Sequence, residues 1–367
     1  MLSALVAALA AIAPSQARQP DGASWPERPV WASRIVADGG GRLDWSLQGD
    51  KLVFDRPDRG DGLFDLWLLD LTSAAERCLT CTVPELRGAH ALDPAWHPSG
   101  EYVVFQVQQN ARKLRLTVSE LAGASRGLHG DLWLVRSDGR DLWQLTRAAE
   151  MGSAVLTPHF SHEGSALLWS ERVASRPAPW GAWQLRTADF RIRRGVPSLK
   201  GLLAHRPTGL PGLILAEAFL PDDQRMLLAA ERTPGGALDI AIWDPRTKAL
   251  EQLTASGAGD DAHARISPRG DFLAWAADAI ARRGPGDEAG ELPAREVWTM
   301  SLDGSDRRPL TRFNGDDNEG LGRAWVGDLA WSPSGDRLAV QVIHGIVEPR
   351  AAIVLLELDP ALRRVAR

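Results

Sequence analysis

One pattern of apolar and polar positions recurs six times along the chain. Each copy has a large apolar residue, then a polar turn, then a run of apolar residues. Proline fixes φ early in several of these turns, and glycine or aspartate occupies the position that needs a positive φ, so each copy predicts a β-hairpin. The copies are DWSLQGDKLVF (44–54), AWHPSGEYVVF (95–105), HFSHEGSALLW (159–169), AFLPDDQRMLL (218–228), RISPRGDFLAW (265–275) and AWSPSGDRLAV (330–340).

A segment rich in β-forming residues follows each hairpin and predicts a third strand. These segments are DLWLLDL (65–71), DLWLVRS (131–137), AWQLRTA (182–188), DIAIWDP (239–245), EVWTMSL (296–302) and AAIVLLEL (351–358). In four copies a Leu-Thr pair closes the unit, with its Thr 15 residues after the acidic residue that opens the third strand. We interpret this element as a fourth strand, and the pairs are Leu79-Thr80, Leu145-Thr146, Leu253-Thr254 and Leu310-Thr311.

Six units of four short antiparallel strands predict an all-β fold, a six-bladed β-propeller spanning residues 41–367. Sheets this small are unstable alone, and a ring lets each sheet bury its faces on its neighbours. Two modes of ring closure are open: the sixth blade takes its outer strand from the C-terminus, or from residues 31–37 (WASRIVA), which we favour. Tryptophans recur in register and are expected in the core between blades; they are Trp45, Trp67, Trp96, Trp133, Trp183, Trp298 and Trp331.

The turn and strand motifs carry a resemblance to a known family. SPSGD, SPRGD, HPSGE and the DLWLxxxDG…LT series resemble the TolB-like propeller repeat, from about Gly41 to the end of the chain. A separate α/β domain of a hundred or more residues precedes the propeller in TolB proper, whereas only some 23 residues lie between Ala17 and Gly41 here. The resemblance implies an exported protein of TolB-like type that binds a protein or envelope component.

The N-terminus predicts export. Residues 1–13 are apolar but too short to span a bilayer, and Ser15 and Ala17 form an A-x-A-like cleavage site. We therefore expect a signal peptide at residues 1–17, an N-terminal segment at 18–40 and a periplasmic or secreted location, with no transmembrane segment in the mature chain. An apolar N-terminal helix is the alternative. The net charge of −5 makes nucleic acid an unsuitable partner.

The two cysteines, Cys78 and Cys81, form the motif CLTC. A haem attachment site would need His at position 82, which is Thr, and a zinc site would need further ligands, since no second Cys pair exists. The spacing leaves two alternatives open: a short-loop disulfide, or reduced thiols on an outer strand.

Polar residues at matching positions of the first strands predict a site at the central channel. Two and four residues before the turns, five of the six copies have a carboxylate, an arginine or a histidine, among them Arg42, whereas the fourth copy has only Ala216 and Ala218. In this interpretation Arg265 grips a ligand carboxylate, and Asp93 and Asp328 orient the histidines. A small anionic ligand suits this set better than a bare metal, which Arg265 would repel. The candidate binding residues are Asp44, Asp93, His159, His263, Arg265 and Asp328.

Catalytic motifs are absent from the sequence: it has no G-x-S-x-G, H-E-x-x-H or P-loop. The first hypothesis is therefore an exported, non-enzymatic binding or scaffold protein that uses a propeller face or the channel mouth, with no cofactor. The alternative is a propeller hydrolase or lyase with a polar channel site holding a divalent metal. Convergence of the candidate carboxylates and histidines on one point would favour the enzyme. The long loops at 108–129 and 278–295 are a second candidate surface.

Overall fold

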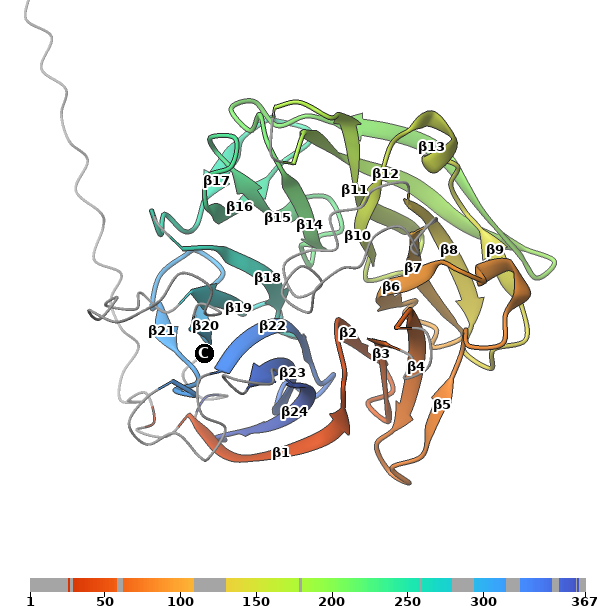
Figure 1. Ribbon diagram of the computed structural model, residues 1–367. Helices are drawn as coiled ribbons and strands as arrows, with labels where there is room; N and C mark the ends of the chain where they lie inside the picture. The colour runs from red at the N-terminus through yellow and green to blue at the C-terminus, as the bar shows by residue number, and fades with distance from the viewer. Residues whose placement is uncertain are drawn as a thin grey trace, which may run out of the picture.

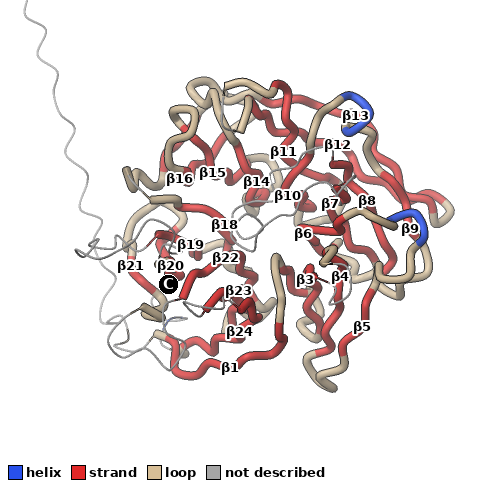
Figure 2. Tube along the Cα trace, in the orientation of Figure 1, coloured by secondary structure: helices blue, strands red, loops and turns tan. Residues whose placement is uncertain are grey.

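The computed structural model describes residues 26, 29–57, 62–108, 130–177, 180–257, 259–278, 294–314, 324–344, 350–360 and 362. These residues form six four-stranded antiparallel sheets around one centre, so the chain is an all-β, six-bladed β-propeller (Figure 1). Apart from two 3-10 turns at Pro84–Leu86 and Ala149–Met151, nearly all regular structure in the described residues is strand (Figure 2). The fold predicted from the repeat is confirmed.

Blades 1 to 5 run outward from the centre of the ring in chain order, and blade 6 does so for its first three strands. The inner strands are β2 (Leu43–Trp45), β6 (His90–Trp96), β10 (Val155–Phe160), β14 (Ile214–Phe219), β18 (Asp261–Ile266) and β22 (Ala324–Trp331). The second strands are β3 (Lys51–Pro57), β7 (Tyr102–Gln108), β11 (Ala166–Ala174), β15 (Met226–Glu231), β19 (Phe272–Asp278) and β23 (Arg337–His344). We number the blades 1 to 6 by these inner strands.

A third strand follows each hairpin, as the sequence predicted. These strands are β4 (Phe64–Asp70), β8 (Gly130–Arg136), β12 (Ala182–Arg193), β16 (Leu238–Trp243), β20 (Arg295–Ser301) and β24 (Arg350–Leu358). The outer strands are β5 (Glu76–Cys78), β9 (Leu142–Gln144), β13 (Val196–His205), β17 (Leu250–Gln252), β21 (Arg308–Pro309) and, for blade 6, β1 (Val30–Asp38).

The ring closes through the N-terminal segment. β1 pairs antiparallel with β24, from Val30 opposite Leu358 to Asp38 opposite Ala352. Figure 1 shows these strands side by side at the rim, although they come from opposite ends of the chain. Blade 6 therefore takes its outer strand from the N-terminal side, and the residues near 365 that would supply the other mode of closure lie outside the described residues.

A buried apolar cluster lies at each junction between consecutive blades. Between blades 2 and 3, for example, Leu132 and Leu134 pack with Val155, Leu167 and Trp169, all at most 1% exposed. Burying a leucine of this kind contributes about 1.5–3 kcal/mol. The recurrent tryptophans all lie in or against these clusters, so they act as core between blades as predicted.

The hairpin turns have the predicted backbone. Gly335 has φ of 68° and Asp223, at the matching position of the fourth copy, has φ of 52°. Asp223 tolerates this left-handed conformation and uses its side chain as well, since Oδ1 accepts a hydrogen bond from the main-chain N–H of His162 at 2.9 Å. The turn of blade 4 is thereby tied to the turn of blade 3.

The Leu-Thr pairs do not form the fourth strands but follow them directly, and we call their contact the outer clasp. Each third strand contains an acidic residue followed directly by an apolar one. The Thr hydroxyl accepts a hydrogen bond from the main-chain N–H of the apolar residue and donates one to the side chain of the acidic residue. In blade 2, Leu132 N–H lies 2.9 Å from Thr146 Oγ1, which lies 3.0 Å from Asp131 Oδ1. The same contact joins Thr80 to Asp65, Thr254 to Asp239 and Thr311 to Glu296. The clasp explains the constant spacing seen in the sequence, because the Thr and the acidic residue that it joins are 15 residues apart in all four blades.

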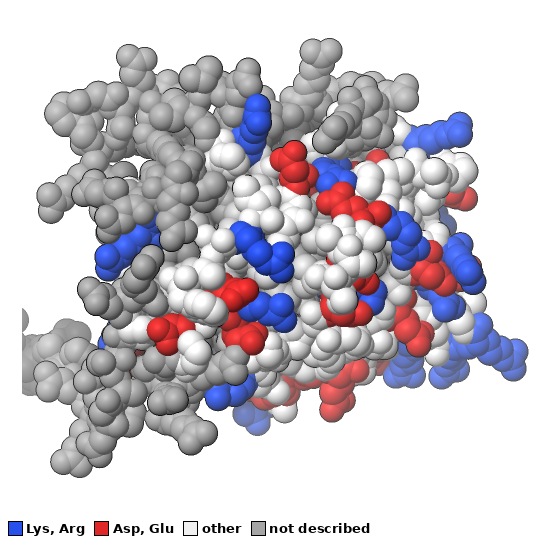
Figure 3. All heavy atoms as spheres, turned by 90° about the horizontal axis from the view of Figure 1, so that it is seen from below, with Lys and Arg blue, Asp and Glu red and all other residues white. Residues whose placement is uncertain are grey.

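Cys78 and Cys81 form a disulfide at the end of β5, with Cα atoms 5.8 Å apart. Of the two alternatives left open by the sequence, the structure has the disulfide. The part of the rim coloured in Figure 3 carries mixed charge, with acidic and basic side chains interspersed and no large patch of one sign. No helix among the described residues is long and apolar enough to cross a membrane.

Candidate functional site

The inner strands of blades 2 to 6 are irregular close to the centre of the ring. Each has a register shift against its second strand, which marks a β-bulge. In three blades the bulged residue has a positive φ: 58° at Asp93, 48° at Thr157 and 57° at His263. A bulge takes an amide N–H out of the strand ladder, and left-handed non-glycine residues concentrate at functional sites. The displaced amides therefore need other acceptors.

In blades 2 to 5 a side chain of the preceding blade accepts such an amide, and we call this contact the inner clasp. Asp328 of blade 6 likewise accepts an amide of blade 1, although β2 has no bulge, and its own N–H donates to Gln341 within blade 6. The inner clasp ties consecutive blades together at the centre of the ring, where buried N–H groups without an acceptor would be costly. The bonds are Asp93 N to Asp55 Oδ2 (2.9 Å), Thr157 N to Asp93 Oδ2 (2.6 Å), Ala216 N to Ser170 Oγ (2.7 Å), His263 N to Glu217 Oε1 (3.0 Å) and Leu43 N to Asp328 Oδ2 (3.1 Å).

Arg42 is the least satisfied charged group in this ring. Its side chain is buried, its main-chain N–H donates to Asp55 Oδ1 at 3.0 Å, and Nη1 donates to Asp93 Oδ1 at 3.2 Å. The two donors on the other edge of the guanidinium, Nε and Nη2, are buried and have no hydrogen-bond partner. These two N–H groups are parallel and form the fork that binds a carboxylate with two hydrogen bonds.

Arg265 differs from Arg42 because both of its terminal nitrogens are held by the protein. Nη1 lies 3.1 Å from Glu217 Oε2, and Nη2 lies 3.0 Å from Asp328 Oδ1. His263 is buried beside the same carboxylate, with Nδ1 3.9 Å from Asp328 Oδ1. The sequence pattern assigned Arg265 to a ligand carboxylate, but two acidic groups of the chain already occupy it. Among the described residues at the centre of the ring, Arg42 is the arginine whose buried Nε and Nη2 have no hydrogen-bond partner.

Asp44 and His159 are half-buried and lie at the same register position as Arg265, two residues nearer the turn than Arg42 and His263. Asp44 Oδ2 accepts a hydrogen bond from Trp96 N–H at 2.7 Å, again joining blades 1 and 2. His159 Nε2 is buried without a hydrogen-bond partner. The charges of Arg42 and Arg265 both act on the His159 ring, so these three side chains share one electrostatic environment.

Burial dominates the ionisation of this region. It raises the pKa of Asp55 and of Glu217 to about 7 and that of Asp44 to about 6, against a smaller lowering by hydrogen bonds and arginines. Burial also lowers the pKa of His159 and His263 well below 6.5, so both rings are neutral at neutral pH.

The two arginines keep their charge. Burial lowers the pKa of Arg42 and Arg265, but the surrounding carboxylates outweigh it and raise both pKa values above the ordinary value for arginine. The centre of the ring therefore contains two fixed cations and several acidic groups that hold their protons up to nearly neutral pH.

All six residues named from the sequence lie in the inner part of the ring. The structure pairs Arg265 with Asp328 and brings His263 close to that carboxylate, while Asp93 pairs with Arg42. The register pattern missed Asp55 and Glu217. Asp55 lies six positions after its turn glycine, where blades 3 and 6 have the polar residues Ser170 and Gln341 inside apolar runs, and this repetition could have been recognised.

The candidate residues do not converge as a metal site. Among the described residues, the one set of three or more His, Cys, Asp or Glu with ligand atoms within 4.8 Å of one another is Asp65, Cys78 and Cys81, on the outer edge of blade 1. The carboxylates at the centre instead accept main-chain and arginine N–H groups. The long loops at 108–129 and 278–295, the second candidate surface, fall almost wholly outside the described residues.

Comparison with known proteins supports the fold. No protein-family profile matches the sequence, and no curated protein matches it. Among solved structures, the chain is similar to a TolB-type protein from Agrobacterium tumefaciens, with 18% identity, a TM-score of 0.53, and coverage of 88% of this chain and 93% of that one. The propeller is thus TolB-like in fold.

Enzymes share the same architecture. An oligogalacturonate lyase from Vibrio parahaemolyticus has 11% identity and a TM-score of 0.51, with 90% of this chain and 94% of that chain covered. A puromycin-hydrolysing peptidase from Mycobacterium tuberculosis has 14% identity and a TM-score of 0.53. This match covers 93% of this chain but only 55% of the peptidase, so the chain spans little more than half of that enzyme. At identities this low, the structural similarity establishes only the fold. An activity has to be inferred from the residues of the site.

Proposed function

We propose that this chain is an exported binding protein of TolB-like type that holds a protein or envelope partner through an acidic group at the centre of its ring. The observation that carries the proposal is the unfilled fork of Arg42, with Nε and Nη2 buried and unpartnered. Buried donors without acceptors cost about 1–3 kcal/mol each, and a carboxylate would satisfy both at once. His159 Nε2, also without a partner, adds a third polar atom in the same electrostatic environment.

The surrounding groups favour binding over chemistry. The oxygens of Asp93, Asp328 and Glu217 are occupied by main-chain amides and arginines, so these carboxylates hold the ring in place. A rigid centre with one unfilled cationic fork suits recognition of a carboxylate, either on a small acid or on an acidic side chain of a partner.

A thermal-shift titration tests this proposal. Wild type is titrated with dicarboxylic acids, with acidic oligosaccharides and with an acidic peptide, and each is matched by its neutral amide or ester. Arg42→Lys keeps the charge and the reach to Asp93 but removes the fork, whereas Arg140→Lys changes a side chain that is 83% exposed. Stabilisation should follow RT ln(1 + [L]/Kd), about 2.7 kcal/mol at 100 times Kd.

A ligand that stabilises wild type and Arg140→Lys but not Arg42→Lys supports the fork as the binding group. Equal stabilisation of all three proteins would place the ligand elsewhere, and no stabilisation by any acid would overturn the proposal for small ligands. Capture of a partner from the cell envelope, repeated with Arg42→Lys, extends the test to proteins: a partner retained by the variant does not use the fork.

Export is part of the same proposal and rests on the apolar residues 1–13 followed by Ser15 and Ala17. N-terminal sequencing of the protein from its own host should begin near Arg18. An intact Met1 on protein recovered from the cytoplasm contradicts export and leaves the binding site untouched.

One observation favours the enzymatic alternative. Asp44 is half-buried, its pKa is about 6, and it feels the charge of Arg265, which is the kind of carboxyl that exchanges protons near neutral pH. Oligogalacturonate, the acidic substrate in the name of one enzyme with the same fold, can be used to test the enzymatic alternative. Product formed by wild type with divalent metal and abolished in Asp44→Asn would establish a hydrolase or lyase, whereas binding without turnover supports the first proposal.

A further inference from the structure

The outer edge of blade 1 departs from the repeated design in a way that the fold does not require. Blades 2, 4 and 5 build the outer clasp without cysteine. Two residues before the Thr, blades 2 and 4 have a glutamine whose amide donates to the acidic residue at 3.3 Å: Gln144 to Asp131 and Gln252 to Asp239. Blade 1 has Cys78 at this position, and Cys81 directly after Thr80.

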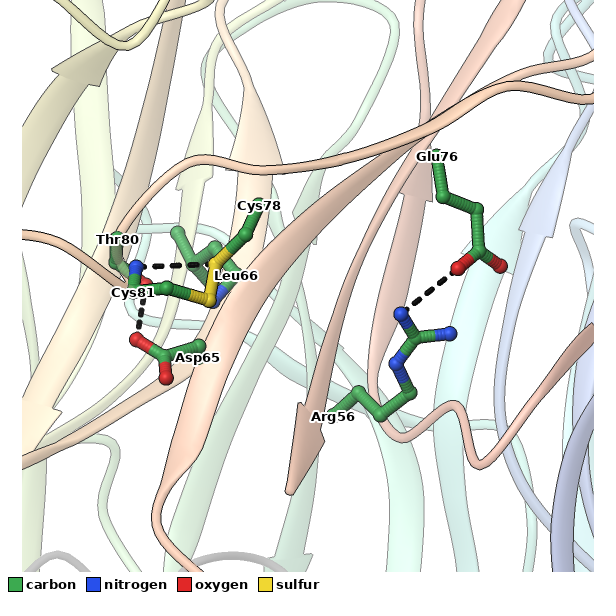
Figure 4. Close-up of a disulfide and its surroundings, with 7 residues drawn as sticks. All are labelled: Arg56, Asp65, Leu66, Glu76, Cys78, Thr80 and Cys81. Carbon is green, nitrogen blue, oxygen red and sulfur yellow. Dashed lines mark hydrogen bonds and ion pairs between the residues drawn. A yellow bond between two sulfur atoms is a disulfide. The ribbon is translucent and has the colours of Figure 1, made fainter. Parts of the chain in front are cut away.

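Three potential metal ligands meet at this edge. One carboxylate oxygen of Asp65 and the sulfurs of Cys78 and Cys81 all lie within 4.8 Å of one another. Figure 4 shows the Asp65 side chain beside the disulfide, with a dashed line for its hydrogen bond with Thr80. Donors on one tetrahedral zinc ion are roughly 3.5–3.8 Å apart, given bonds of about 2.3 Å to sulfur and 2.1 Å to oxygen. Small side-chain rotations after reduction would bring the three atoms to that separation.

Two hydrogen bonds prepare these groups for a cation. The main-chain N–H of Cys81 points at Cys78 Sγ, with nitrogen and sulfur 3.0 Å apart, and such a donor stabilises a thiolate once the sulfur is reduced. Thr80 Oγ1 donates to Asp65 Oδ1 at 2.6 Å and fixes the carboxylate, as hydrogen bonds to ligating carboxylates do in metal proteins. Cys81 is exposed and Cys78 and Asp65 are half-buried, so an ion can reach the site from solvent.

We infer that the reduced form of this edge, with Asp65, Cys78 and Cys81 as ligands, binds a thiophilic divalent cation such as zinc and leaves a fourth position for water. The disulfide and the metal-bound form exclude each other, because both sulfurs are used in either state. A small dithiol or disulfide exchanges the two forms. Two external thiols reduce the disulfide and become one external disulfide, and metal binding then releases the two protons of the cysteines.

Oxidation reverses these steps. An external disulfide accepts two electrons from the two bound thiolates and, with two protons, yields two external thiols, the Cys78–Cys81 disulfide and the free cation. The edge of blade 1 would thus hold a cation only under reducing conditions. This inference concerns a different part of the molecule from the Arg42 fork and does not depend on the proposed function.

Cadmium titration of the full chain tests it. The protein is reduced with a phosphine, transferred without oxygen into metal-free buffer, and titrated while the thiolate-to-cadmium absorption band is recorded. Reduced wild type should saturate with one cadmium per chain, and zinc should displace it. The oxidised wild type and Cys78→Ser should lack this saturable band.

Asp65→Asn separates the three-ligand site from a simple pair of thiols. The variant keeps an oxygen that can accept the Thr80 hydroxyl but loses the carboxylate, and its affinity should fall by about tenfold or more. Asp131→Asn makes the same change in the cysteine-free clasp of blade 2 and should bind as wild type does.

Unchanged affinity in Asp65→Asn, one cadmium shared by two chains, or binding no tighter than in Cys78→Ser would each overturn the inference. If Asp65→Asn does not fold, as judged by circular dichroism, the cadmium NMR shift of wild type decides instead, because it distinguishes two thiolates plus oxygen from other ligand sets. Rapid reoxidation of the dithiol in the presence of zinc, without metal uptake, would also overturn it and would point to thiol exchange.

Discussion

The inner and outer edges of the blades both use a side-chain oxygen to hold main-chain amides, but they do so in contrasting ways. The outer clasp uses the same residue types in four blades, joins residues 15 apart, and lies within one blade. The inner clasp uses Asp, Ser or Glu from different strands and always joins two blades. The outer clasp is repeated with little change and is therefore part of the common architecture of the blades. The residue types of the inner clasp vary, which shows that individual blades have become specialised at the centre.

Charge separates the two edges further. In the outer clasp an acidic group meets hydroxyl and amide donors near the surface, and no arginine is needed. At the centre the buried Arg42, the half-buried Arg265 and five acidic groups lie close enough to act on one another, so each depends on the others. The outer edge should therefore respond to mutation locally and additively, and the inner edge collectively.

The largest effect should come from removing the one outer strand that is not local in sequence. Deletion of residues 18–38 removes β1 and leaves the edge of β24 unpaired along its length. We expect the free energy of unfolding to fall by more than about 4 kcal/mol and the melting temperature to drop by at least several degrees. Deletion of residues 18–25 is the control, since it spares β1. Equal melting temperatures for the two truncations would mean that the ring closes without this strand.

Asp328→Ala should be the most damaging single change at the inner edge. The carboxylate holds Arg265 and accepts Leu43 N–H, so its loss leaves a buried charge half-paired and should cost about 3–5 kcal/mol in chemical denaturation. Asp189→Ala, which breaks an exposed pair with Arg191, should stay within about 0.5 kcal/mol of wild type.

Coupling sharpens this test. In a double-mutant cycle, Asp328→Ala and Arg265→Met should show an interaction energy of about 1–3 kcal/mol, because the second change removes the charge that the first leaves unpaired. Additive effects would show that the two groups are screened from each other, and the inner edge would then resemble the outer one.

The same contrast explains what the sequence could and could not predict. The outer clasp, the turns and the strand order follow from local repeats: Thr146 and Thr254 stand at the same offset from an acidic residue, and Gly335 and Asp223 take the same backbone conformation. The location of Asp93 and Asp328 on the inner strands could also be predicted, because the register of the first strands repeats.

The pairing at the centre was not predictable in the same way. Arg265 was expected to serve a ligand, but Glu217 occupies it from the neighbouring blade, at a position where no other blade has an acid. Contacts between blades depend on how two sheets face each other, which a repeat within one blade does not specify. The unfilled fork of Arg42 follows only from knowing that Asp93 takes its other edge.

The pH dependence of stability gives a smaller, graded effect. Asp55 has a pKa of about 7 in the folded chain and 3.8 as its ordinary value, so between about pH 4 and 7 the folded state keeps a proton that the unfolded chain has lost. This group therefore stabilises the fold at low pH, and its contribution declines as pH rises, by at most about 1.4 kcal/mol per pH unit. The lowered pKa values of His159 and His263 act in the opposite direction and weaken the fold as pH falls below 6.5.

Asp55→Asn isolates the carboxylate from the histidines. The variant loses hydrogen-bond acceptors and should be less stable than wild type at pH 4, but it has no proton to lose. The difference in melting temperature between the two proteins should therefore shrink as pH rises to 7 and stay constant above about pH 8. A difference that is constant from pH 4 to 7 would show that Asp55 is ionised throughout, paired with Arg42.

The smallest effect should come from the outer clasp. Thr146→Val keeps the side-chain shape but leaves Leu132 N–H and one oxygen of Asp131 without the hydroxyl, at a cost of about 1–2 kcal/mol in chemical denaturation. Thr254→Val should cost a similar amount, and because the two sites lie in blades 2 and 4 with no shared partner, the double variant should equal the sum within about 0.5 kcal/mol. Neither change should alter the response of the melting temperature to acidic ligands, since both lie at the outer edge. A coupling above 1 kcal/mol between these threonines would show that the blades respond as one unit even at the rim.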